Sequence, residues 1–95
     1  MRVIRTALLA ALLPIAALAH GGGRDIKGTI VRFDAERVVV NRVDRQVEAV
    51  PLTRSTTYRV GQKAGSWRDL RAGSRVVVHI GHDGTALEIH LPARQ

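Results

Sequence analysis

The chain has 95 residues, no cysteine and a formal net charge of +7 at neutral pH. A chain of this length builds one small hydrophobic core, which excludes a multidomain protein and a large buried active site. The lack of cysteine excludes disulfide bonds and thiolate metal centres.

Residues 1–19 have the pattern of a secretory signal peptide. Arg2 and Arg5 form a short basic start, and the uncharged stretch that follows is rich in Ala and Leu. It ends in Ala-Leu-Ala, with Ala19 directly before His20, which suits signal peptidase. The apolar run is shorter than the ~20 residues of a transmembrane helix. We therefore expect cleavage after Ala19 and a periplasmic or secreted mature chain without stable membrane insertion; an uncleaved N-terminal anchor is the alternative.

The mature chain has the composition of a β domain. Val and Ile total 15 residues against four Leu, and β-branched side chains favour strands over helices. We expect a flexible glycine-rich segment over 20–25 and one domain over 26–92. Five strands are expected in this domain: Ile26–Phe33, Arg37–Val43, Gln46–Leu52, Arg75–Gly81 and Thr85–Leu91. A weaker extended piece lies at Thr56–Val60.

The connections between these strands also carry signals. Residues 34–36 and 43–45 are typical of hairpin connections, and the segment 81–84, with Gly84, is the clearest turn. Pairing across this last turn predicts that His79 faces Ala86 and that His90 faces Arg75. The alternation predicts one core face, made of Val76, Val78, Ile80, Leu87, Ile89 and Leu91.

One helical turn is expected between the third and fourth strands. Ser66 can cap it, and Asp69 sits at its positive N-terminal end. Gly73 can end it in the left-handed conformation, while Trp67 and Leu70 face the core. Together these elements predict an all-β fold, a small five-stranded antiparallel OB-like barrel. Closure would remove sticky strand edges. A two-layer β-sandwich is the alternative, and the first strand is expected to bend at Gly28.

The order of motifs resembles a known family. The motifs are Lys27-Gly-Thr-Ile-Val-Arg32, Val38-Val-Val40, Val50-Pro-Leu-Thr-Arg-Ser-Thr-Thr-Tyr58, Trp67-Arg-Asp-Leu-Arg-Ala-Gly-Ser-Arg-Val76 and Asp83-Gly-Thr-Ala-Leu-Glu-Ile89. Over Lys27 to Leu91 the chain resembles the exported bacterial small-barrel family catalogued as domain of unknown function 5666. The motifs are turns and core positions, so the resemblance implies a fold and an exported location, and no activity.

A weaker resemblance is to the periplasmic copper and silver chaperones, which have a five-stranded OB barrel. Their ligands are Met thioethers and a His, with a Trp over the metal. The mature chain has no Met, and Trp67 is expected in the helical turn. Only the fold and the compartment therefore carry over from this family.

Four histidines raise the question of a metal site. His79 and His90 are expected on the outer face but about 13 Å apart, too far for one ion. His82 lies at the hairpin tip beside Asp83. If cleavage exposes His20, its α-amine and ring could chelate Cu(II) or another transition metal, with His79 or His82 as a further ligand. A solvated surface role is the plainer alternative for each histidine.

Arginine dominates the basic residues. Eleven of the 13 basic residues that follow Ala19 are Arg, which suits bidentate contact with phosphate or carboxylate. Too few aromatic residues are available to stack nucleic-acid bases. Export also argues against a nucleic-acid substrate, so the candidate partner is an anionic envelope polymer, lipid headgroups or an acidic envelope protein. The candidate anion-binding residues are Arg37, Arg42, Arg68, Arg71 and Arg75; a merely soluble surface is the alternative.

No arrangement of nucleophile and base suggests catalysis. The serines and aspartates lie at turns and helix starts, where local hydrogen bonds explain them. The sequence therefore predicts an exported, monomeric, non-catalytic binding or interaction module. A metal-handling protein and an adaptor for an anionic envelope component are the two sharper hypotheses.

Overall fold

The computed structural model describes residues 23–93; the expected signal segment, the predicted cleavage site at Ala19 and His20 lie outside this part. The five expected strands are present, with ends within two residues of the prediction. Across the described residues the elements are β1 (Arg24–Phe33), β2 (Arg37–Arg42), β3 (Val47–Pro51), β4 (Thr57–Val60), β5 (Lys63–Ala64), the 3-10 helix η2 (Trp67–Asp69), β6 (Arg75–Ile80) and β7 (Ala86–Leu91).

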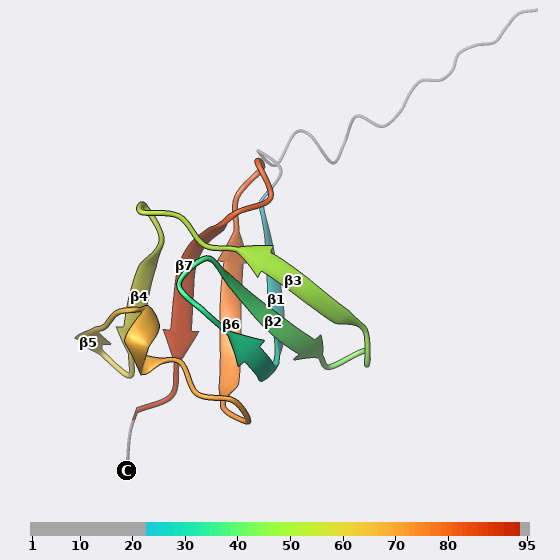
Figure 1. The fold of residues 1–95 in the computed structure, drawn as a ribbon, viewed down its shortest axis with the longest axis horizontal. Helices are drawn as coiled ribbons and strands as arrows, with labels where there is room; N and C mark the ends of the chain where they lie inside the picture. Colours follow the sequence, from blue (N-terminus) through green and yellow to red (C-terminus); the bar gives the residue numbers. More distant parts are fainter. Residues whose placement is uncertain (1–22, 94–95) are drawn as a thin grey trace, which may run out of the picture.

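All seven strands belong to one sheet with the order β3-β2-β1-β6-β7-β4-β5 (Figure 1). Neighbours are antiparallel except β4 and β7, which run parallel. The hydrogen-bond ladder is open, with β3 and β5 at its two ends. The all-β class is therefore as expected. The strand number is corrected from five to seven, because the weak piece before Gly61 forms β4 and pairs with the short β5.

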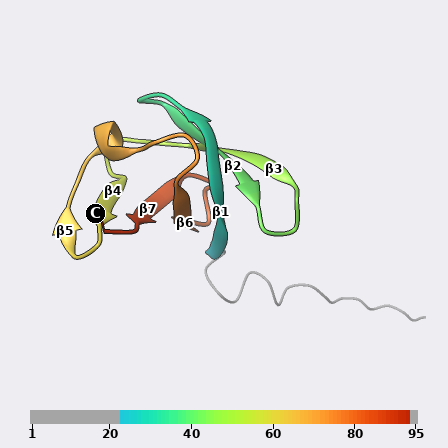
Figure 2. The same ribbon diagram turned by 90° about the horizontal axis from the view of Figure 1, so that it is seen from below.

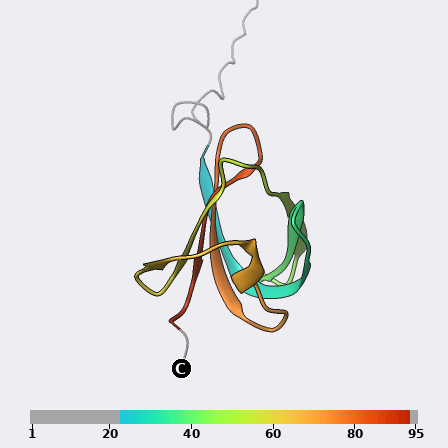
Figure 3. The same ribbon diagram turned by 60° about the vertical axis from the view of Figure 1, so that its left-hand side comes forward.

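The sheet curls around a single core. β2 and β3 lie across from β6 and β7 (Figure 3), and β3 and β5 lie on opposite sides of the molecule (Figure 2). The 52–56 segment joins β3 to β4. Its buried Thr56 hydroxyl donates to the Ala86 carbonyl at 2.7 Å, which fixes this segment to the start of β7. The core consists of Ile26, Ile30, Val38, Val40, Val50, Leu52, Leu70, Val76, Val78, Ile80, Ala86, Ile89 and Leu91.

β1 pairs with strands on both sides, in the two halves of the curled sheet. It pairs with β6 over residues 24–29 and with β2 over residues 28–33, so Gly28 has a strand on each side. A Cβ at Gly28 would lie 2.2 Å from the Asn41 carbonyl oxygen. Only glycine therefore permits this approach of β1 to β2, at the position where the sequence predicts a bend.

The β6–β7 hairpin departs from the predicted register. His79 lies opposite Glu88 and Ile80 lies opposite Ala86, so Leu87 is an extra residue, a β-bulge. The bulge reverses the inside–outside alternation. Leu87 is 55% exposed, and Ala86 is buried. The predicted core position of Leu87 and the pairing of His79 with Ala86 are therefore wrong.

The same shift moves His90. It lies opposite Val77 and not, as predicted, opposite Arg75. His79 and His90 are thus two rows apart along the sheet instead of four, because the pairing is displaced by two residues.

The helical turn forms where it is expected. The Ser66 hydroxyl accepts from the Arg68 amide at 3.2 Å, and the Asp69 carboxylate accepts from the Ser66 amide at 2.8 Å, a reciprocal capping box. The turn ends at Leu70, which is fully buried. Gly73 does have a positive φ of 88°, but it lies in the turn before β6 and not at the helix end. No helix among residues 23–93 is long and apolar enough to cross a membrane.

Candidate functional site

The strand register arranges the outer face of β1, β6, β7 and β4 in rows. Lys27 on β1 lies opposite Val77 on β6, and Val77 lies opposite His90 on β7. His90 in turn pairs with Arg59 on β4. Paired side chains lie on the same face, with Cβ atoms about 4.5–5.5 Å apart. One row therefore places Lys27, His90 and Arg59 on the same face of four strands, with Val77 between Lys27 and His90.

Arg75 adjoins this row and helps to form an open pocket. It lies opposite Thr29, the next outward position of β1 after Lys27. The pocket has a volume of about 530 Å3, and its lining combines Lys27, Arg75 and His90 with apolar groups, Val43, Val76, Val77, Leu91 and Pro92 among them. We call Lys27, Arg59, Arg75 and His90 the cationic patch.

The cations of this patch form no ion pairs within residues 23–93, although the neighbouring row of the same face carries Asp25 and Glu88. Among residues 23–93, no acidic side chain forms an ion pair with Lys27, Arg59 or Arg75. His90 Nε2 donates to the Gly61 carbonyl at 3.1 Å, which orients the ring at the edge of the patch. An exposed cation without an internal ion pair remains available to an external anion. The patch therefore suits a phosphate or carboxylate group.

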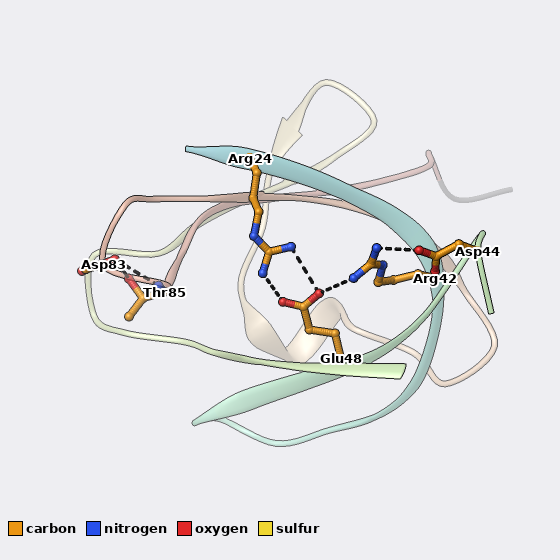
Figure 4. Close-up of polar contacts among 6 residues, drawn as sticks. All are labelled: Arg24, Arg42, Asp44, Glu48, Asp83 and Thr85. Atoms are coloured by element: carbon orange, nitrogen blue, oxygen red, sulfur yellow. Dashed lines mark hydrogen bonds and ion pairs between the residues drawn. The ribbon is translucent and has the colours of Figure 1, made fainter. Parts of the chain in front are cut away.

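The inward side of the curl contains a contrasting, fully paired cluster (Figure 4). Arg24 on β1 makes a two-pronged ion pair with Glu48 on β3. Arg42 bonds Glu48 at 3.0 Å and Asp44 at 2.6 Å. We call Arg24, Arg42, Asp44 and Glu48 the charge network. It links the two layers of the sheet beside the core.

The charge network also changes the titration of its members. The hydrogen bonds from Arg24 hold the pKa of Glu48 below its usual range, with Arg42 adding to the effect. The same bond raises the pKa of Arg24. Two arginines are thus engaged by carboxylates of the protein itself.

The predicted anion-binding arginines occupy different settings. Arg75 belongs to the cationic patch, whereas Arg42 is held in the charge network. Arg68 lies over the Trp67 ring, 5.4 Å from its centroid, and Arg71 donates to the Arg68 and Leu70 carbonyls. Arg37 is exposed at the start of β2. The structure thus gathers a different set than the sequence suggested.

Lys27, Arg59 and His90 were missed because they come from three separate strands. Each lies at an alternate, outward position of its strand, which sequence periodicity can detect. Their alignment depends on the parallel β4–β7 pairing and on the Leu87 bulge. Neither feature has a local sequence signal, so the patch could not be assembled from the sequence.

The candidate metal ligands are also spread out. His79 Nδ1 lies 2.6 Å from Asp25 Oδ1, and His79 Nε2 lies 3.9 Å from Glu88 Oε1. His82 is exposed at the hairpin tip, where Asp83 accepts from the Thr85 amide and hydroxyl, which lowers the pKa of Asp83 (Figure 4). No group of three or more His, Asp or Glu side chains between residues 23 and 93 is arranged to hold an ion by itself.

A second hollow of about 800 Å3 lies between the 52–56 segment and the helical turn. Tyr58 and Trp67 both line it, with Glu36, Arg54 and Ser66 among the polar residues. Burial raises the pKa of Tyr58. Both rings also pack against the core, which accounts for their position without a ligand.

No family model, curated protein or solved structure matches this chain. Its function must therefore be argued from the geometry of its own residues.

Proposed function

We propose that this chain is an exported, non-catalytic β module that binds an anionic partner of the cell envelope through the cationic patch. The observation that carries the proposal is the set of unpaired cations, Lys27, Arg59 and Arg75, gathered with His90 on one sheet face. The contrast with the charge network supports it, because this fold does pair arginines where they serve the structure.

The fold is proposed to be a barrel-like relative of the small-barrel family, domain of unknown function 5666. Support comes from the curled sheet, whose first strand pairs on both sides around Gly28. The short 52–56 segment further requires the β3 and β4 regions, near opposite ends of the strand order, to approach each other. Export is proposed from the signal pattern that ends at Ala19.

The chemistry of the patch favours phosphate or carboxylate over nucleic-acid bases. Lys and Arg supply charged donors, and the pocket lining also includes the apolar residues Val77, Leu91 and Pro92. The pocket lining contains no Phe, Tyr or Trp on which bases could stack. An anionic polymer or acidic protein surface is therefore the proposed partner class.

Calorimetric titration with inorganic polyphosphate tests this proposal. The double variant Lys27→Gln/Arg75→Gln should weaken binding at least about tenfold at low salt, because two patch cations are lost. Wild-type binding should also weaken steeply as the salt concentration rises.

A matched control separates the patch from net charge. Arg32→Gln/Arg45→Gln removes the same charge from two exposed arginines outside the pocket lining. This control should weaken binding by no more than about threefold. If both double variants lost the same affinity for polyphosphate, the proposal would be contradicted, because binding would then depend on overall charge alone.

A further inference from the structure

The second hollow gathers two of the three aromatic side chains of this protein. The chain has one Trp, one Tyr and one Phe, and both Trp67 and Tyr58 line the hollow. Each of the two side chains is partly exposed as well as packed against the core. The electron-rich face of an aromatic ring favours contact with weakly positive C–H groups. Packing against the core accounts for where the rings lie, and their exposed parts remain available to a ligand.

Three polar groups on the lining of this hollow have no partner within residues 23–93. The Tyr58 hydroxyl forms no hydrogen bond there, and the side chains of Glu36 and Arg54 form neither a hydrogen bond nor an ion pair. Burial raises the pKa of Tyr58, so its hydroxyl stays protonated at neutral pH and can both donate and accept. A carboxylate, a guanidinium and a phenol are therefore all free to bond to a ligand.

Backbone hydrogen bonds hold the walls of the hollow in place. The Leu52 amide donates to the Glu36 carbonyl at 2.8 Å, which ties the 52–56 segment to the connection between β1 and β2. The Gly65 amide donates to the Tyr58 carbonyl at 2.9 Å, which ties the entry of the helical turn to β4. The capping box then fixes the turn that carries Trp67. A preformed site of this kind loses little conformational entropy on binding.

The combination of aromatic rings and uncommitted polar groups suits a sugar. A sugar ring has a C–H face that can lie on an aromatic ring, and its hydroxyl groups donate to a carboxylate and accept from a guanidinium. Glu36 and Arg54 are the two charged residues of the lining, and their charges cancel, which favours a neutral ligand. The volume of about 800 Å3 lies within the range of about 300–1,000 Å3 that is typical of ligand pockets.

We propose that the hollow lined by Tyr58 and Trp67 binds a neutral, hexose-containing glycan, whose hydroxyl groups bond to Glu36 and Arg54. The site lies on the opposite side of β4 from the cationic patch. Tyr58 pairs with the buried Ile89, whereas the next residue, Arg59, belongs to the patch. Successive side chains of a strand point to opposite faces. Glycan binding is therefore independent of the anion binding proposed above.

The fluorescence of Trp67 provides a direct test, because it is the one Trp of the chain and it lines the hollow. The probes are the soluble hexasaccharides of glucose, N-acetylglucosamine, mannose and galactose. At least one of them should change the Trp67 emission in a saturable way, with a Kd below about 1 mM. This binding should hardly depend on the salt concentration, since the sugars carry no charge.

Two variants test the polar groups of the hollow. Tyr58→Phe keeps the ring and removes only the hydroxyl, so it should weaken glycan binding by about threefold to tenfold. Glu36→Ala/Arg54→Ala removes two exposed side chains without a change in net charge, and it should weaken binding at least about tenfold. Urea denaturation should give this double variant a stability close to that of the wild type, because neither side chain has a partner in the described part of the chain.

A matched control removes the same pair of residue types outside the hollow. Arg32→Ala/Glu88→Ala should leave glycan binding unchanged, since neither residue lines the hollow. The two proposed sites can also fail separately. Lys27→Gln/Arg75→Gln should leave glycan binding unchanged, and the double variant of the hollow should leave polyphosphate binding unchanged.

Three results would overturn the glycan proposal. The first is the absence of a saturable change in Trp67 emission with all four hexasaccharides. The second is an equal loss of affinity in Glu36→Ala/Arg54→Ala and in Arg32→Ala/Glu88→Ala, which would place the sugar elsewhere. The third is saturable binding of indole without binding of any of the four sugars, which would assign the hollow to a flat aromatic ligand.

Discussion

The charge network and the cationic patch both contain basic side chains, but in opposite surroundings. In the network, Arg24 and Arg42 are both satisfied by Glu48, and Asp44 adds a further bond. In the patch, Lys27 and Arg75 lie around one pocket without an acidic partner in the described part of the chain. The net charge of a small basic protein is therefore a poor guide to its binding surface; what matters is which cations the fold leaves unpaired.

The two regions share β1, on which Gly28 follows Lys27 of the patch and pairs with Arg42 of the network. Gly28→Ala is expected to have the largest effect, because its new Cβ would fall 2.2 Å from the Asn41 carbonyl oxygen, a backbone atom that cannot swing away. We expect a loss of at least about 3 kcal/mol in the free energy of unfolding, measured by urea denaturation. The charge network and the cationic patch should lose their structure together in this variant.

Gly84→Ala is the control for this prediction. Gly84 has a φ of 85° but nothing within 4 Å of the added Cβ, so only backbone strain opposes the change. That strain costs about 1–2 kcal/mol. A Gly28→Ala variant no less stable than Gly84→Ala would show that β1 does not approach β2 as closely as described.

Glu48→Gln should break the charge network and leave the patch intact. Arg24 and Arg42 would lose their shared carboxylate, and we expect a loss of about 1 kcal/mol, limited by the partial exposure of the cluster. Glu36→Gln removes the same charge from an exposed side chain outside the network and should cost less than about 0.5 kcal/mol. If urea denaturation gave Glu48→Gln and Glu36→Gln the same stability, the charge network would not contribute to the stability of the fold.

The same residue predicts an acid response. Ion pairing lowers the pKa of Glu48 in the folded protein below its ordinary 4.5, so the unfolded chain binds the proton more readily. The stabilisation is therefore complete above pH 4.5 and is lost as the pH falls through the folded-state pKa. Wild type should lose more unfolding free energy than Glu48→Gln between about pH 6 and pH 3. Parallel curves for the two proteins would contradict this assignment.

The smallest stability effect should come from the patch itself. Lys27→Gln/Arg75→Gln removes exposed cations that form no ion pair within residues 23–93, so the unfolding free energy should change by less than about 0.5 kcal/mol. Relief of repulsion between neighbouring cations would make any change a slight gain. A loss of more than about 1 kcal/mol in the denaturation curve would show that these residues serve the fold.

The sequence predicted the local structure better than the site. Alternating Val and Ile located the strands, and Ser66 with Asp69 located the helical turn, because these signals act over a few residues. The bulge at Leu87 was not predicted. The apolar and polar residues of 85–91 alternate regularly, so the sequence does not show that β7 has one residue more than β6 at this point. Because of this extra residue, Ala86 is buried, Leu87 is exposed and His79 pairs with Glu88. The site depends on such long-range register, which no single strand encodes.

The most direct test is backbone amide NMR during titration with polyphosphate. If the cationic patch is the binding site, the largest shift changes should gather in Lys27–Thr29, Arg75–Val77 and His90, with small changes around Glu48. Changes centred on Arg37, Arg68 and Arg71, or spread evenly over the arginines, would contradict the claim that unpaired cations define the binding surface.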